Sequence, residues 1–71
     1  EIDEKLFPLL MAKLFADRQM YPSPDVFEYL NRRIDRSFSS INIIVEKIDQ
    51  ISIEEKRPIT RSLVSKILKN L

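Results

Sequence analysis

Residues 38–51 read FSSINIIVEKIDQI, and this stretch decides the fold. Its apolar residues recur at intervals of three and four, which places them on one face of an α-helix and argues against a strand, despite the many β-branched side chains. The members of this stripe are Phe38, Ile41, Ile44, Val45, Ile48 and Ile51. The spacing predicts the longest helix of the chain, running to about Glu54. Asp35 or Ser37 can cap its start, and we prefer Ser37.

Two shorter helices are predicted ahead of this stretch. Leu6, Leu10 and Leu14 recur every four residues, with Phe7 and Met11 beside them, which indicates an amphipathic helix of about 15 residues that starts near residue 3.

The run YPSPD at 21–25 separates the first helix from the second. Its first proline stops what precedes it, Ser23 can cap, and Pro24 suits the first position of a helix that continues to about Ile34. The apolar face of this second helix consists of Val26, Phe27, Leu30 and Ile34.

A fourth helix follows a polar loop at residues 54–58. Thr60 is placed to cap it, and Ile59 is placed to pack against Val64 as a hydrophobic staple. Its buried face is expected to consist of Leu63, Val64, Ile67, Leu68 and Leu71. Four amphipathic helices with short connections predict an all-α fold, a small four-helix bundle that forms a single domain over residues 1–71. A sheet would need turn glycines, which the sequence lacks.

The absence of glycine, histidine, cysteine and tryptophan excludes several kinds of chemistry. Without glycine there is no loop that can wrap a phosphate, and without histidine or cysteine the usual general base and the usual zinc ligands are missing. The carboxylate pairs Asp35 with Asp49 and Glu54 with Glu55 are interpreted as surface residues. We therefore expect no catalytic residue, no metal site and no cofactor within this chain, which is not an enzyme by itself.

Charge and hydropathy set further expectations. Twelve Lys and Arg against eleven Asp and Glu give a net charge of +1, which argues against strong non-specific binding to nucleic acid. There is no secretory segment and no apolar run long enough to span a membrane, and the chain begins at Glu1 without methionine. We expect a cytoplasmic fragment of a larger protein, with one exposed apolar patch that favours a homodimer.

Basic residues gather in two places, Arg32, Arg33 and Arg36 near the end of the second helix and Lys56, Arg57 and Arg61 around the last loop. Arginine forks match phosphate and carboxylate oxygens, so these residues are candidates for contact with a partner, and the alternative is ordinary solvated charge. Tyr21 and Tyr29 are interpreted as residues at the rim of the core rather than as stacking platforms for bases.

An independent module that binds DNA or protein is the alternative function. The second helix, the turn at residues 35–37 and the third helix permit a helix-turn-helix interpretation. Acidic residues such as Glu46 and Asp49 lie on the polar face of the third helix, and they argue against its being a recognition helix.

Two stretches of the sequence, DVFEYLNRRIDR at 25–36 and RPITRSLVSKIL at 57–68, are similar to a known family. They resemble the C-terminal helical lid of AAA+ ATPases related to the bacterial replication initiator DnaA, and most of all the lids of the Hda type. LFADRQ at 14–19 is similar to the same type, so the resemblance covers nearly the whole chain.

The resemblance implies a non-catalytic lid that sits over a nucleotide held by a separate α/β domain ahead of Glu1. The parent protein would hold ATP or ADP and would regulate the initiation of chromosomal replication. The implied partners are its own ATPase domain, DnaA and, through a segment ahead of this chain, the sliding clamp, without direct contact to nucleic acid.

In lids of this family, an arginine near the start of the third helix, the sensor-2 residue, usually reaches the nucleotide phosphates. Alignment of RRI at 32–34 on the family pattern puts Ser39 at that position. Arg36, three residues earlier, is the candidate substitute. The resemblance therefore implies that Ser39 and Arg36 face the nucleotide, and the serine implies that ATP and ADP are discriminated by groups outside this chain.

Overall fold

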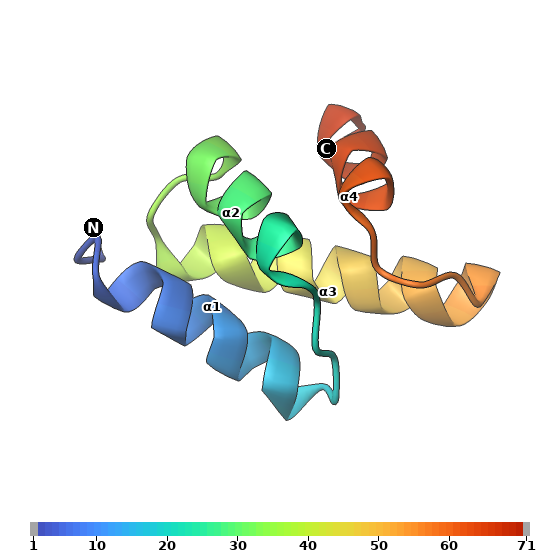
Figure 1. Ribbon diagram of the computed structural model, residues 1–71, viewed down its shortest axis with the longest axis horizontal. Helices are drawn as coiled ribbons and strands as arrows, with labels where there is room; N and C mark the ends of the chain where they lie inside the picture. Colours follow the sequence, from blue (N-terminus) through green and yellow to red (C-terminus); the bar gives the residue numbers. More distant parts are fainter. Residues whose placement is uncertain (1, 71) are drawn as a thin grey trace.

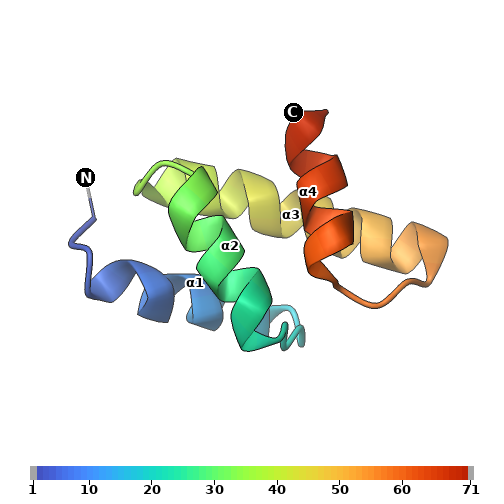
Figure 2. The same ribbon diagram turned by 45° about the horizontal axis from the view of Figure 1, so that its top comes forward.

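The computed structural model describes residues 2–70, and this part of the chain contains four α-helices and no strand. The helices are α1 (Leu6–Asp17), α2 (Pro24–Arg33), α3 (Phe38–Glu55) and α4 (Arg61–Lys69). In Figures 1 and 2, α1 and α3 run in the same general direction; α2 lies across this pair, and α4 lies beside α2 and against α3. The predicted all-α fold, a small helical bundle, is confirmed.

The helices contact one another in a closed ring. Among the described residues, close backbone contacts join α1 to α2 and α3, and join α4 to the same two helices. All four helices contribute to one hydrophobic core, in which Phe15 of α1 meets Phe27 of α2 edge to face at 5.6 Å between ring centroids. The buried members of this core are Phe7, Met11, Phe15, Met20, Val26, Leu30, Ile41, Ile44, Val45, Ile48, Leu63, Val64 and Ile67.

The buried face of α1 matches the predicted one only in part: Phe7 and Met11, which were included in it, are buried, but the leucines are not at its centre. Its fully buried residues are Phe7, Met11 and Phe15, whereas Leu6 is 58% exposed and the other two leucines of the predicted stripe are only partly buried. The prediction counted a regular row of leucines, but the core is filled by the larger side chains on the adjacent row, because an aromatic ring buries more apolar area.

The start of α1 is also later than predicted. Asp3 precedes the helix: its carbonyl oxygen accepts hydrogen bonds from the backbone N–H groups of Leu6 and Phe7, and its carboxylate accepts one from the N–H of Lys5 at 2.7 Å. The helix begins at Leu6, so Pro8 lies in the first turn, where its missing N–H leaves no hydrogen bond unmade.

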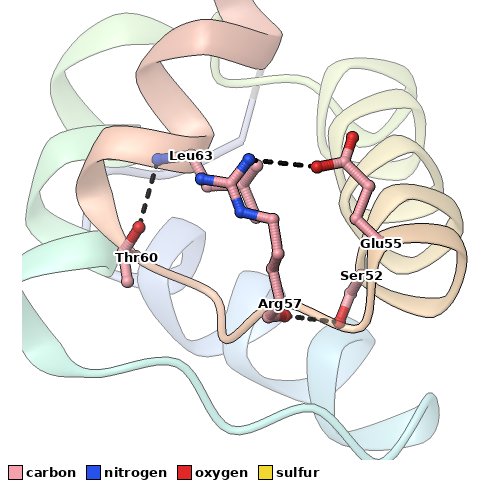
Figure 3. A network of polar contacts seen from close by, with 5 residues as sticks. All are labelled: Ser52, Glu55, Arg57, Thr60 and Leu63. Carbon is pink, nitrogen blue, oxygen red and sulfur yellow. Dashed lines mark hydrogen bonds and ion pairs between the residues drawn. The ribbon is translucent and has the colours of Figure 1, made fainter.

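The caps predicted for α3 and α4 are confirmed. The hydroxyl of Ser37 accepts a hydrogen bond from the N–H of Ser40 at 3.1 Å. The hydroxyl of Thr60 accepts one from the N–H of Leu63 at 3.2 Å (Figure 3). Ser23 occupies the cap position of α2 with an extended backbone, but its hydroxyl donates to the carboxylate of Asp25 instead of accepting from the helix.

The stripes of α2, α3 and α4 largely match the sequence pattern. The exception on α3 is Phe38, which the pattern placed in the stripe but which is 53% exposed at the first position of the helix. Ile59 is partly buried against the core, as a staple requires, and Leu71 lies outside the described residues. Within residues 2–70, every helix is too short or too polar to cross a membrane.

Two residues other than glycine adopt left-handed backbone conformations, Gln19 with φ 60° and Lys56 with φ 52°. Gln19 follows the end of α1: its N–H bonds to the carbonyl of Ala16 at 2.8 Å, and the N–H of Met20 bonds to the carbonyl of Phe15 at 2.9 Å. This pair of bonds is the Schellman motif, and the buried Met20 supplies the apolar contact that accompanies it. Lys56 directly follows α3 as its C-cap residue.

Candidate partner-binding groove and the turn before α3

The turn between α2 and α3 carries the two residues that the family resemblance assigns to the nucleotide. Ser39 is exposed at the second position of α3, and its hydroxyl lies 3.3 Å from that of Ser37. The Ser37 hydroxyl also donates to that of Ser40 at 2.8 Å. Three serine hydroxyls are therefore gathered at the positive end of the helix dipole, where they offer neutral polar groups and no formal charge.

Arg36 lies in the same turn and is engaged by the segment ahead of α1. Its carbonyl oxygen accepts a hydrogen bond from the N–H of Ile2 at 2.9 Å, and its guanidinium lies 3.8 Å from the carboxylate of Glu4. That distance is long for an ion pair, and the Glu4 side chain is 83% exposed, so the guanidinium remains free to turn toward another anion.

A groove between α2 and α4 brings together two arginines that are distant in the sequence. The Arg33 guanidinium lies 4.8 Å from the centroid of the Tyr29 ring, and the Arg61 guanidinium lies 5.8 Å from the same centroid. Tyr29 and Arg33 are one helical turn apart on α2, while Arg61 begins α4. One half-buried aromatic ring thus attracts two cations through its electron-rich face.

The groove has a volume of about 780 Å³. Besides Tyr29 and the two arginines, its walls come from α4 and consist of Ser62, Ser65, Leu68 and Lys69. No carboxylate contributes to this lining. A smaller depression of about 190 Å³ adjoins it, and there Arg32 lies with Asp25 and Glu28 beside the same tyrosine and arginines.

The two remaining candidate arginines are bound to acids of their own chain. Arg32 donates to the carboxylate of Glu28, one turn earlier, at 2.9 Å. Arg57, in the loop before α4, donates to Glu55 at 3.0 Å, and its carbonyl oxygen accepts from the Ser52 hydroxyl at 3.3 Å (Figure 3). Arg57 helps to fold the loop back onto the end of α3 and does not line the groove.

The rim position predicted for Tyr29 is confirmed, because the residue is partly buried against the core, but its contacts with two arginines were not predicted. The arginines were predicted as two separate clusters, whereas the structure brings Arg33 and Arg61 together at the ring of this tyrosine. The interval of four between Tyr29 and Arg33 was the available signal, because residues at that spacing are neighbours on a helix surface. The approach of Arg61 depends on the packing of α4 against α2, which no local pattern shows.

Other chemistry is sparse in the described part of the chain. Residues 2–70 contain no group of three or more carboxylates close enough together to hold a metal ion. The pair Asp35 and Asp49 does not form a site: Asp49 receives the Arg18 guanidinium at 2.8 Å and thereby ties the end of α1 to α3.

The fold is that of a small helical module with a groove between α2 and α4. Comparison with family models identifies the class more closely: the model described as "Hda, lid domain" matches residues 5–68. The chain therefore belongs to the Hda lid family, and it is the lid domain of an Hda-like regulator. Such a lid is a non-catalytic helical module. Searches of curated proteins and of solved structures found no significant match.

Proposed function

We propose that this lid follows an α/β ATPase domain in the same protein and packs over the ATP or ADP which that domain holds. The parent protein would be a cytoplasmic regulator of chromosomal replication initiation, with DnaA as its partner and with a clamp-binding segment ahead of the ATPase domain. The match to the Hda lid family over residues 5–68 carries this proposal. The lid itself would contribute no catalytic group.

The surface near the turn before α3 supports contact with another domain. Phe38 is 53% exposed directly beside Ser39, and Leu6 is 58% exposed at the start of α1. The backbone bond between Ile2 and Arg36 holds the segment ahead of α1 against this turn. Exposed large apolar side chains next to polar groups are typical of surfaces that another domain covers.

The serine at position 39 limits the contribution of the lid to nucleotide affinity. Its neutral hydroxyl cannot make the charge-assisted contact of an arginine to phosphate, which is worth about 1.5–3 kcal/mol. We therefore expect discrimination between ATP and ADP to depend on the ATPase domain, while the lid covers the site.

The coding sequence ahead of Glu1 is the first test of this proposal. A preceding α/β domain of about 150 residues with a glycine-rich phosphate loop is the expected finding. Its absence would contradict the proposal and favour an independent binding module.

Nucleotide titration of the full-length protein by calorimetry is the second test. Ser39→Ala should change the Kd for ATP by only about two- to threefold, the low end for a neutral hydrogen bond at an exposed position. Ser39→Arg, which restores the charge usual in the family, should tighten binding. A tenfold loss on Ser39→Ala would show that the serine has a direct role, and the same loss on Arg36→Ala alone would identify Arg36 as the substitute.

A further inference from the structure

We propose that the groove between α2 and α4 binds an acidic segment of a partner protein, with Arg33 and Arg61 receiving its carboxylates. This site uses neither Ser39 nor Arg36, although Arg33 and Leu68 also line a depression that reaches Asp35 and Ser40. It therefore does not depend on the proposed contact with nucleotide.

The pattern of ion pairs among the arginines carries the inference. The chain has six arginines. Three of them, Arg18, Arg32 and Arg57, are bound to a carboxylate of the chain at 2.8–3.0 Å, and Arg36 lies 3.8 Å from Glu4. The two without such a partner among residues 2–70 are Arg33 and Arg61, and they share the groove. Two cations held near one tyrosine ring repel each other, so an anion bound in the groove that both line lowers their mutual repulsion.

The chemistry of the walls favours a peptide as the source of that anion. Guanidinium groups receive carboxylates through paired N–H donors, the Ser62 and Ser65 hydroxyls add neutral donors, and Lys69 adds a third cation. Leu68, half-buried in the wall, offers an apolar contact. The groove is open to solvent, and its volume of about 780 Å³ leaves room for an extended peptide.

The neighbouring depression argues against nucleic acid. Asp25 and Glu28 lie there beside the same tyrosine and arginines. A strand that crosses the groove would bring its regularly spaced phosphates close to these carboxylates, whereas a peptide can confine its acidic residues to the groove itself. The net charge of +1 also provides little general attraction for a polyanion.

Titration of the 71-residue chain, observed by NMR, tests the proposal. The probe is a short peptide in which aspartate and glutamate alternate with leucine, and its control has asparagine and glutamine in place of the acids. Signals of Tyr29, Arg33 and Arg61 should shift with the acidic peptide and not with the amide control. Equal binding of both peptides, shifts confined to another surface, or no shifts at millimolar peptide would overturn the proposal, as would tighter binding of oligothymidylate of equal charge.

Charge-matched variants separate a specific site from general attraction. Arg33→Gln and Arg61→Gln should each weaken binding about fivefold, the upper end for an exposed ion pair, and the double variant should remove it. Lys13→Gln removes one positive charge from α1, which contributes no residue to the groove, and should leave the Kd unchanged. An equal loss in Lys13→Gln would show attraction without a site and would refute the proposal.

Tyr29 is a positioning residue in this proposal, and conservative replacement tests that role. Tyr29→Leu should weaken binding of the acidic peptide although every charge remains, because the two guanidiniums lose the ring that holds them. Tyr29→Phe keeps the ring and should retain binding. Circular dichroism of each variant confirms that it is folded. Unchanged binding by a folded Tyr29→Leu variant would contradict this part of the proposal.

Discussion

At the scale of single residues, the chain meets the geometric demands of its turns without glycine. The Schellman motif after α1 places Gln19 at a φ of 60°, where a side chain with a Cβ atom is strained. The hydrogen bonds of the motif and the burial of Met20 compensate for that strain. The left-handed conformation still lowers the stability of the fold, and the exposed side chain of Gln19 adds no burial to offset it.

Gln19→Gly should raise the free energy of unfolding by about 0.5–1 kcal/mol. Glycine adopts the left-handed conformation without a steric penalty, and this gain outweighs the greater freedom that glycine gives the unfolded chain. Urea denaturation followed by circular dichroism measures the change. Lys13→Gly, at an exposed position inside α1, is the control and should instead lower stability by about 1 kcal/mol. Equal destabilisation by both substitutions would show that the strain at Gln19 is negligible.

At the scale of elements, α1 shows which features a sequence pattern can predict. The existence of the helix and its approximate length were predicted, because both depend on the local spacing of apolar residues. The row of residues that faces the core was not, because rows beginning at Leu6 and at Phe7 are both apolar. Only the shape of the space between α2 and α3 favours the row with two phenylalanines.

The same distinction applies to the candidate site. The caps of α3 and α4 were predicted from Ser37 and Thr60, since a cap depends on residues within one turn. The groove depends on the approach of α4 to α2. The sequence pattern therefore could not predict that Arg33 and Arg61 meet, or that both contact Tyr29.

Phe15→Ala should lower the free energy of unfolding by about 3–4 kcal/mol, because it removes a fully buried ring and its edge-to-face contact with Phe27. Leu9→Ala, on the same helix but 68% exposed, should change it by less than about 0.5 kcal/mol. Thermal denaturation of both variants provides the measurement. Similar losses for the two would mean that the buried face of α1 is assigned incorrectly.

At the scale of the whole molecule, the bundle leaves apolar side chains uncovered. Leu6 and Leu9 lie three residues apart on α1, at 58% and 68% exposed, so they share one face of the helix. In the parent protein another domain is expected to cover such a patch. When the 71-residue chain is studied by itself, a second copy of the chain can cover this patch.

Sedimentation equilibrium of the 71-residue chain should show a weak monomer–dimer equilibrium. The double substitution Leu6→Ser and Leu9→Ser should shift it toward monomer, because it removes the apolar area that favours association. Ile53→Ser, near the far end of α3 and also 68% exposed, is the matched control and should leave the equilibrium unchanged. A monomeric wild-type chain at millimolar concentration would rule out this dimer.

Because of the ring of contacts among the helices, the two middle helices are held together by the first and last helices. Among the described residues, α2 and α3 have no close backbone contact with each other, and each meets both α1 and α4. The first and last helices therefore connect the two middle helices, whereas in many proteins the terminal segments are poorly ordered. Amide protons in the middle of α1 and α4 should therefore exchange with solvent only when the entire chain unfolds. For the same reason, removal of either terminal helix by a protease should unfold the whole domain.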